Sequence, residues 1–371
     1  MLMNIIFRTD ASLDIGTGHV MRCLTLAQAL RAQGASCRFI CRPHEGNLLE
    51  LIRKRGFEAQ ALATQVVMQE KLTEKYESVP AHAASLGVDW KTDAEQTKNL
   101  IGDVVVDWLI VDHYAIDKNW QLLLENCYHK LMVIDDLGDR DHQADILLDQ
   151  NAQGKSGEAR YKGRTNAECN LLLGPHYALL GLDYPLLANA LPERNGEISR
   201  VLIFVGGSDP FHLTERYLTA LNAPEFRHLY VDVVIGSNHS APEAVSDLVS
   251  RVEHARVYYE LPSLSALIIR ADLMLGAGGA TNWERMCLGL NSVIVSVAIN
   301  QHGINQELEK KGLIYFLGKV EHANINLIRA GLKQILVNPS GNRVSSKRMR
   351  ELVDGNGCRR VVQALIDQRN I

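Results

Sequence analysis

The segment NIIFRTDASLDIGTGHVMRC, residues 4–23, joins an apolar run to a glycine-rich turn. Its first part, 4–8, is apolar and typical of a buried strand. The turn contains Gly16 and Gly18, and a helical pattern follows from Val20. A strand, a glycine turn and a helix in this order are typical of a parallel α/β sheet.

The same alternation of strand and helix continues along the chain. We predict further strands at 37–41, 108–112, 130–135, 200–205, 230–235, 273–275 and 292–296, and helices at 20–32, 48–55 and 282–288. The strands are nearly continuous apolar runs, as expected for parallel sheets that are covered on both faces. The predicted fold class is therefore α/β.

The chain has 371 residues, and this length favours two domains over one. The stretch 191–197, LPERNGE, is polar and contains proline and glycine, so we take it as the linker. It separates an N-terminal domain, 1–192, from a second α/β domain that begins at 198. Residues 64–102 are long for a connection, and we predict an excursion with helices of its own over a ligand cleft.

Composition excludes several classes of protein. The net charge of −4 and the pI near 6.4 give no footprint for nucleic-acid binding. No apolar run reaches the ~18 residues of a membrane span, and the apolar N-terminus is too short for a signal peptide. The seven cysteines include no C-x-x-C pair, which favours a reducing cytoplasm and buried thiols over disulfides or structural zinc.

His19 stands at the end of the first glycine turn, beside the start of a helix. The positive end of a helix disfavours the imidazolium and helps to keep a neutral ring that can accept a proton. The spacing is not the dinucleotide fingerprint, because Met21 stands where that motif has its third glycine, and Arg22 follows it. Taken alone, the turn fits a catalytic histidine and a simple capping histidine equally well.

Two further glycine turns lie in the second half. One is Gly206-Gly207-Ser208-Asp209, and the other runs from Gly276 to Glu284. We expect Gly278, Gly279 and Thr281 to offer amides and a hydroxyl to a diphosphate. Glu284 can accept hydrogen bonds from a ribose diol, or it can merely complement the helix dipole. Asn300-Gln301 forms another polar pair after a predicted strand.

These motifs, in this order, resemble the UDP-2,4-diacetamido-2,4,6-trideoxy-β-L-altropyranose hydrolases, the PseG family of pseudaminic acid biosynthesis. The matching pieces are Arg8-Thr9-Asp10-Ala11-Ser12, the stretch from Ile15 to Leu24, Asp112-His113-Tyr114, Asp135-Asp136, Gly206-Gly207-Ser208-Asp209, Gly278-Gly279 with Glu284, Asn300-Gln301, and Val353-Asp354-Gly355-Asn356-Gly357. They span most of the chain.

The resemblance implies a GT-B-like fold, in which two Rossmann-like domains face each other across a cleft. It places the UDP moiety on the C-terminal domain, 198–352, and the sugar near the N-terminal glycine turn. The remaining residues, 353–371, are expected to form a helix that packs back on the first domain.

The resemblance also implies the reaction: hydrolysis of the sugar C1–O bond with inversion, His19 acting as the general base. The products are UDP and the free sugar, for the glycosylation of flagellin or another surface glycan. The implied partner is a small UDP-sugar, with no cofactor, metal, nucleic acid or membrane, and the protein is expected to be a cytoplasmic monomer. A glycosyltransferase with a UDP-sugar donor and a non-catalytic nucleotide-sugar binder are the alternatives.

The role of several residues stays open. Arg22 either faces the diphosphate or pairs with Asp10, and Tyr114 either stacks on the sugar or hydrogen-bonds to it. The acidic run that begins at Asp135 has no firm metal-ligand geometry. The residues that we assign to substrate binding are Asp10, Gly16, Thr17, Gly18, Arg22, Tyr114, Gly207, Ser208, Gly278, Gly279, Thr281, Asn282, Glu284, Asn300 and Gln301.

One departure from the family pattern concerns the sugar. After Tyr177-Ala178-Leu179-Leu180 the family commonly has arginine, whereas this chain has Gly181. If that arginine contributes to the substrate cleft, this protein compensates elsewhere or acts on a different sugar.

Overall fold

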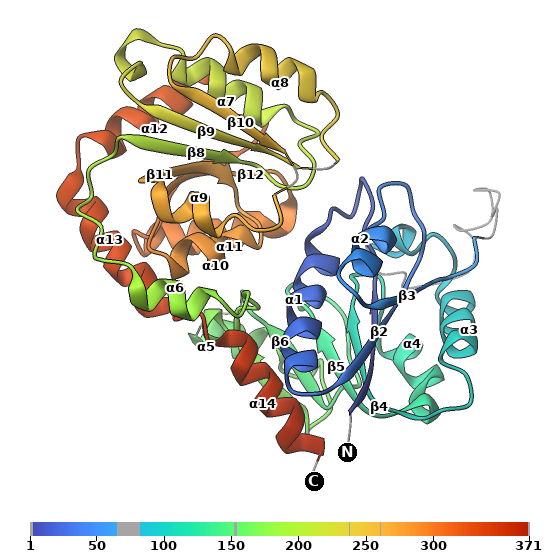
Figure 1. The fold of residues 1–371 in the computed structure, drawn as a ribbon. Coiled ribbons are helices and arrows are strands. Elements are labelled where there is room, and N and C mark those ends of the chain that lie inside the picture. Colours follow the sequence, from blue (N-terminus) through green and yellow to red (C-terminus); the bar gives the residue numbers. More distant parts are fainter. Residues whose placement is uncertain (1–2, 65–81, 152–153, 237, 260, 370–371) are drawn as a thin grey trace. The chain divides into compact units, whose positions relative to one another are not determined.

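The computed structural model describes residues 3–64, 82–151, 154–236, 238–259 and 261–369. The chain divides into two compact units (Figure 1). The first unit comprises Met1–Gly181 and Gly357–Ile371, and the second comprises Leu182–Asn356.

The first unit is built on a parallel sheet of seven strands in the order β3-β2-β1-β4-β5-β6-β7. The strands are β1 Asn4–Thr9, β2 Ser36–Cys41, β3 Glu58–Ala61, β4 Val106–Asp112, β5 Tyr128–Ile134, β6 Ile146–Asp149 and β7 Asn170–Leu173. The helices are α1 Gly18–Ala32, α2 Leu49–Lys54, α3 Trp90–Ile101, α4 Lys118–Leu123, α5 Gly154–Tyr161 and α14 Gly357–Arg369. Strands β1, β4 and β6 are buried along nearly their whole length, as coverage of both faces requires.

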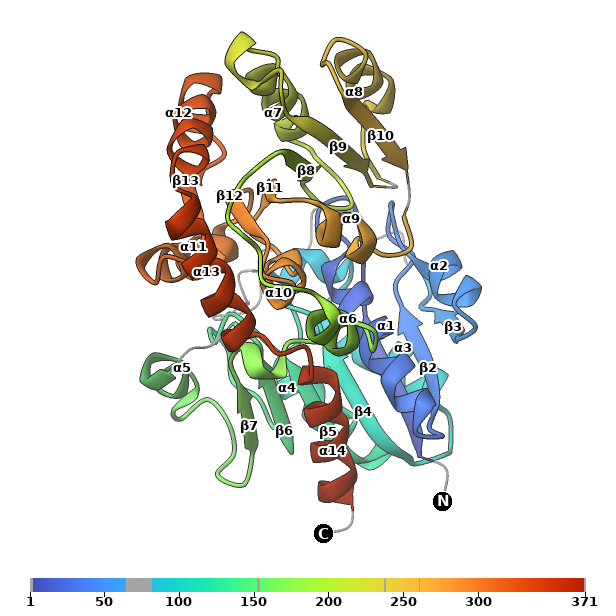
Figure 2. The same cartoon turned by 60° about the vertical axis from the view of Figure 1, so that its left-hand side comes forward.

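The C-terminal helix α14 belongs to the first unit (Figure 2). Its Val361 and Leu365 are buried in the same apolar cluster as Leu26 and Leu30 of α1. The last helix therefore completes a core that the N-terminal residues begin.

The second unit is built on a parallel sheet of six strands in the order β10-β9-β8-β11-β12-β13. The strands are β8 Arg200–Phe204, β9 Tyr230–Ile235, β10 Ala255–Tyr259, β11 Leu273–Ala277, β12 Asn291–Ser296 and β13 Tyr315–Lys319. The helices are α6 Tyr184–Ala190, α7 Leu213–Leu221, α8 Pro242–Val249, α9 Ser265–Arg270, α10 Thr281–Cys287, α11 Ile299–Lys310, α12 Ile325–Leu336 and α13 Pro339–Leu352.

Each sheet reverses its strand order once. In the first sheet the chain moves outward from β1 and then returns to place β4 on the other side of β1. In the second sheet β8 is flanked in the same way by β9 and β11. Ligands of open α/β sheets bind at the carboxyl ends of strands at such a reversal. The turns after β1, β4, β8 and β11 are therefore the places to look for a site.

The predicted strands and helices are present, with ends shifted by a few residues. The sequence did not single out β3, β6, β7, β10 and β13, which have only four or five residues each. The second unit begins at Leu182, ahead of the predicted boundary at 192–198. The reason is α6, which packs against α10 of the second unit. The boundary therefore lies just before α6 instead of after it.

The excursion at 64–102 contains α3, which connects β3 to β4. Its residues 65–81 lie outside the described part of the chain. Among the described residues, none of the helices combines the length and the apolarity needed to span a bilayer.

Candidate active site

His19 and Asp112 meet at the strand reversal of the first unit. His19 lies in the first turn of α1, and Asp112 is the last residue of β4, opposite Thr9 of β1 in the register. Nδ1 of His19 lies 2.6 Å from Oδ1 of Asp112, and both side chains are buried. A carboxylate in this place accepts a hydrogen bond from Nδ1–H and so fixes the ring tautomer with a lone pair on Nε2. Within the described part of the chain, Nε2 takes part in no hydrogen bond.

Arg22 holds the other side of the same carboxylate. Its Nε donates to Oδ2 of Asp112 at 2.6 Å, and its Nη1 donates to Oδ2 of Asp136 at 3.0 Å. Burial alone would raise the pKa of Asp112, but the Arg22 guanidinium and the His19 ring hold it well below its ordinary value. The expected pair of Arg22 with Asp10 is wrong, and the alternative, a contact with the diphosphate, stays a prediction. The arginine keeps Asp112 ionised and in place.

Tyr114 covers one side of the histidine. Its ring meets the His19 ring edge-on, with centroids 4.5 Å apart. Burial and the neighbouring Asp136 raise the pKa of Tyr114 well above its ordinary value, so the phenol stays a neutral hydrogen-bond donor. His113, between Asp112 and Tyr114, accepts the backbone N–H of Ala115 at 3.0 Å with Nδ1, and its Nε2 lies 3.3 Å from Oδ2 of Asp10.

The glycine turn leaves room in front of His19. Gly16 has a φ of 79°, a conformation that disfavours any side chain, and its N–H donates to the carbonyl of Ser12. Gly18 has an ordinary φ and is exposed, and a Cβ added there would meet nothing within 4 Å. The fold therefore does not require glycine at position 18, and Thr17 beside it is half-buried.

Asp10 does not face a ligand. It is fully buried, and its carboxylate accepts from Arg8 and from the backbone N–H of Arg42, each at 2.6 Å. Arg8 and Arg42 also bind Asp93 of α3 at 2.7 and 2.6 Å. The prediction that Asp10 binds substrate is wrong because this ionic cluster, which ties the excursion to β1, uses the carboxylate.

The acidic run after β5 is used within the protein as well. Asp135 pairs with Arg140 at 3.0 Å and accepts the backbone N–H groups of Leu137 and Gly138. Asp136 accepts from Arg22 and Asn151. Both carboxylates thus have partners within the protein, and Asp136 holds Arg22 in place.

In the second unit, the turn after β11 carries the predicted diphosphate ligands. The N–H of Gly278 donates to the carbonyl of Val295 at 3.2 Å, so the prediction that this amide faces a phosphate is wrong. Glycine is needed there because a Cβ would overlap with the side chain of Asn305. Gly279 and Thr281 are half-buried and remain the candidates of this turn.

Glu284 lies one turn into α10 and accepts a hydrogen bond from the Tyr184 hydroxyl at 3.0 Å. Burial raises the pKa of Glu284 to about 7, and the bond from Tyr184 offsets this only in part. The carboxyl therefore titrates near neutrality, which is unusual for a residue that only complements a helix dipole.

Of the other predicted residues of this unit, one is buried and two lie nearer the surface. Asn282 is buried, and its side-chain amide hydrogen-bonds to Asn305 and Arg285 in the interior. Gln301 accepts the backbone N–H of Val297 at 3.0 Å, and its Nε2 lies 3.8 Å from where a Cβ of Gly279 would be. Asn300 is exposed.

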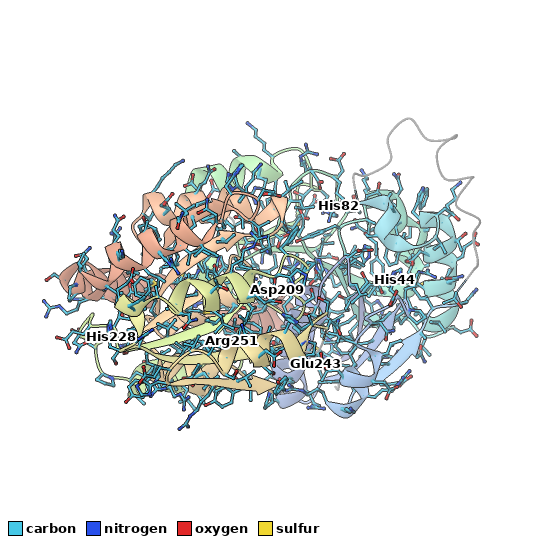
Figure 3. All side chains as sticks on the ribbon, turned by 90° about the horizontal axis from the view of Figure 1, so that it is seen from above. His44, His82, Asp209, His228, Glu243 and Arg251 are labelled. Carbon is cyan, nitrogen blue, oxygen red and sulfur yellow. The ribbon has the colours of Figure 1, made fainter. Side chains whose placement is uncertain are left out.

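Gly207 and Ser208 are half-buried in the turn after β8. The turn ends at Asp209, labelled in Figure 3, which accepts the N–H groups of Leu213 and Thr214 at the start of α7. Asp209, Glu215 and His239 bring potential ligand atoms within 4.8 Å of one another.

Tautomer chemistry argues against a metal at these three residues. Nδ1 of His239 accepts the N–H of Ala241 at 3.1 Å, so a neutral ring carries its proton on Nε2, the atom 3.9 Å from Asp209. A metal ligand needs a lone pair at that atom. We therefore assign no metal to the group.

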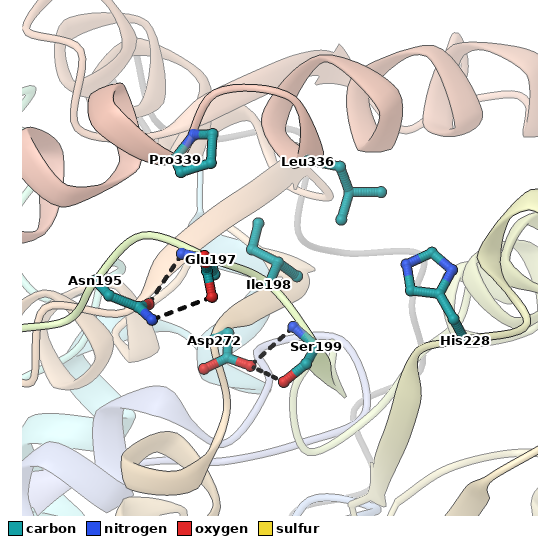
Figure 4. A pocket seen from close by; sticks show the side chains of 8 residues that line it. All are labelled: Asn195, Glu197, Ile198, Ser199, His228, Asp272, Leu336 and Pro339. Atoms are coloured by element: carbon teal, nitrogen blue, oxygen red, sulfur yellow. Dashed lines mark hydrogen bonds between the residues drawn. The ribbon is translucent and has the colours of Figure 1, made fainter.

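A separate cavity lies at the amino edge of the second sheet (Figure 4). Ser199 and Asp272, which line it, come directly before β8 and β11, on the edge away from the glycine turns. Asp272 accepts from the N–H and the hydroxyl of Ser199 at 3.0 and 2.9 Å. In this cavity Ser199 and Asp272 thus bind each other, and the cavity lies away from the predicted site residues.

Sequence reasoning placed Asp112 at the ligand edge of the sheet, because it ends a buried strand, but gave it no role beside His19. It missed Tyr184 and Arg285. These two residues had no signal in the sequence, since their partners are set by tertiary packing.

The chain resembles known proteins in sequence at low identity, and no family model matches it. It is 25% identical over 313 residues, 84% of this chain and 97% of the relative, to the UDP-2,4-diacetamido-2,4,6-trideoxy-β-L-altropyranose hydrolase of Campylobacter jejuni. It is 24% identical over 60% of its length to the spore coat polysaccharide biosynthesis protein SpsG of Bacillus subtilis, covering 70% of that protein. An uncharacterized protein of Methanocaldococcus jannaschii is 22% identical over 89% of the chain, which spans only 61% of that relative. These matches confirm the resemblance that the motifs indicate.

Solved structures show the fold. MurG of Acinetobacter baumannii matches with a TM-score of 0.62 at 15% identity, covering 98% of this chain and 99% of that one. The Medicago truncatula protein UGT71G1, complexed with UDP-glucose, matches with a TM-score of 0.68 at 13% identity, covering 99% and 98%. The fold is α/β with two Rossmann-like units, as in GT-B glycosyltransferases.

Proposed function

We propose that this protein is a UDP-sugar hydrolase of pseudaminic acid biosynthesis. Its substrate would be UDP-2,4-diacetamido-2,4,6-trideoxy-β-L-altropyranose, the compound in the name of the Campylobacter jejuni relative. The observation that carries the proposal is the His19–Asp112 pair, at 2.6 Å, behind an open glycine turn.

In this proposal His19 is the general base. With Asp112 on Nδ1, the lone pair of Nε2 removes a proton from water as the water oxygen bonds to the sugar C1. Asp112 then stabilises the imidazolium that forms, and Arg22 keeps Asp112 ionised. The C1–O bond to the diphosphate breaks on the opposite side, so UDP leaves and the anomeric centre inverts.

The second unit would hold the UDP. Gly279 and Thr281 of one turn, and Gly207 and Ser208 of the other, supply amides and hydroxyls at the ends of the neighbouring strands β11 and β8. Glu284 would accept a ribose hydroxyl. All the groups named here belong to the chain itself.

A GT-B glycosyltransferase is the second candidate, because the solved structures with this fold include glycosyltransferases such as CalG4. It would use the same base on an acceptor hydroxyl instead of water. A non-catalytic UDP-sugar binder would have no need for a buried carboxylate on the histidine.

The test is incubation of the protein with the UDP-sugar alone, followed by NMR. The hydrolase proposal predicts equal amounts of UDP and free sugar without an acceptor, the first sugar formed having the inverted anomeric configuration. Turnover only after an acceptor alcohol is added would favour the transferase. Binding without any turnover would favour the non-catalytic protein.

A further inference from the structure

Arg285 of α10 is a fully buried arginine with no carboxylate beside it. Among the described residues it bonds only to neutral groups: Ser292 Oγ at 2.7 Å and the side-chain oxygen of Asn282. Its Nε has no partner. The other deeply buried arginines differ, because Arg8 and Arg22 each contact two aspartates.

A chain of neutral side chains extends from this guanidinium. Asn282 donates to Asn305 at 3.1 Å, and Asn305 donates to Ser296 of β12 at 2.9 Å. All of these side chains are buried. The chain therefore fixes Arg285 in place without neutralising its charge.

This network lies directly behind the turn after β11. Gly278 packs so closely on Asn305 that a Cβ would overlap with its amide. The next residues, 279–281, come to the surface, and Thr281 stands one helical turn before Arg285 on α10. Asn282, which bonds to the guanidinium, follows Thr281 directly, so the network links the buried positive charge to the part of the turn that solvent reaches.

A buried charge without a partner is costly, because the interior does not replace the hydration that the ion loses. Burial lowers the pKa of Arg285 to about 9, and among the described residues no nearby charge raises it again. Because this pKa is still above 7, the guanidinium is protonated at neutral pH. Because the dielectric constant of the interior is low, this charge also attracts a negative charge that lies a short distance outside the network. An anion that binds at the turn would provide the missing counter-charge.

We propose that Arg285 is a positioning residue that gives the turn at 278–281 a fixed positive charge for the diphosphate of a nucleotide. It acts through Asn282 and the backbone of the turn and does not touch the ligand. The inference rests on the proposed function in one respect, the choice of UDP as the nucleotide.

The test compares UDP with uridine, which has the same base and ribose but no phosphate. Affinities are measured by calorimetry for the wild type, Arg285→Met, Arg285→Lys and Arg194→Met. Arg194 is the matched control: among the described residues it also forms no ion pair, although Asp272 acts on its charge, and it belongs to the same unit but binds the carbonyls of Leu288 and Ile268. Circular dichroism verifies that each variant is folded.

For Arg285→Met we expect UDP to bind at least about tenfold more weakly, which corresponds to about 1.4 kcal/mol, while uridine is unaffected. Arg285→Lys should recover part of the UDP affinity, and Arg194→Met should leave it unchanged. Unchanged UDP affinity in Arg285→Met, or an equal loss for UDP and uridine, would overturn the inference. So would a wild type that binds neither UDP nor pyrophosphate. A wild type that binds UDP in the expected pattern but hydrolyses no UDP-sugar would leave the inference standing and refute the hydrolase.

Discussion

Nδ1 of His19 and Oδ1 of Asp112 are 2.6 Å apart, although the two residues are separated by 93 positions in the chain. The parallel pairing of β1 with β4 brings them together, since Thr9 and Asp112 are partners at the ends of these strands. A histidine whose Nδ1 is held in this way presents Nε2 as a base. The pair therefore converts a glycine turn into a candidate catalytic site.

Asp112→Asn is expected to lower kcat by ~10²–10⁴-fold, because an amide can hold the ring in the wrong tautomer and cannot stabilise the imidazolium. KM should change little, since Asp112 is buried and does not reach the substrate. Steady-state kinetics of UDP release measures both. A loss that lies in KM alone would instead assign Asp112 to binding.

The two glycines of the first turn should behave differently. Gly16→Ala forces a side chain into a φ of 79° and should destabilise the protein by about 1–2 kcal/mol. Gly18→Ala meets no protein atom within 4 Å, so urea unfolding should be unchanged while hydrolysis slows if the substrate approaches there. An active, stable Gly18→Ala protein would show that the substrate does not contact this position.

UDP affinity should depend on pH around neutrality because of Glu284. Burial raises the pKa of its carboxyl to about 7, and only the ionised form accepts two ribose hydrogen bonds, so UDP should bind more weakly as pH falls through 7. In the free protein the same raised pKa makes the free energy of unfolding decrease as pH rises from the ordinary pKa of a glutamate toward 7. Tyr184→Phe removes a hydrogen bond that favours the ionised form, so the inflection should move to higher pH. A pH-independent UDP affinity would exclude Glu284 as a ligand of the ribose.

Asp93→Asn should destabilise the first unit by about 3–5 kcal/mol, because Arg8 and Arg42 lose the buried carboxylate that they share. Burial would raise the pKa of Asp93, but Arg8 and the bond from Arg42 lower it below its ordinary value. Its contribution is therefore present at neutral pH and lost as pH falls through the lowered value. Urea unfolding monitors the change, and Asp89→Asn, at the half-buried N-cap of the same helix, is the control with an expected cost well below about 1 kcal/mol, because asparagine caps a helix about as well as aspartate. Equal costs for the two variants would contradict a special role for the buried cluster.

The sequence predicted the features that depend on local pattern. Strand β1, the glycine turn and helix α1 follow from apolar runs and glycine positions, and so do β11 and α10. The contacts that decide the chemistry are long-range. Arg22 was expected either to face the diphosphate or to pair with Asp10, which is two residues beyond the apolar run, yet its guanidinium binds Asp112 and Asp136. Gly278 resembled an amide donor, but the packing of Asn305 explains the glycine.

The most direct test of the account is the rate of UDP-sugar hydrolysis by His19→Ala under single-turnover conditions, with UDP affinity measured in parallel. The account predicts a rate lower by ~10²–10⁴-fold than that of the wild type and an unchanged affinity for UDP, because we propose that the second unit binds UDP. Hydrolysis at the wild-type rate in His19→Ala would contradict it.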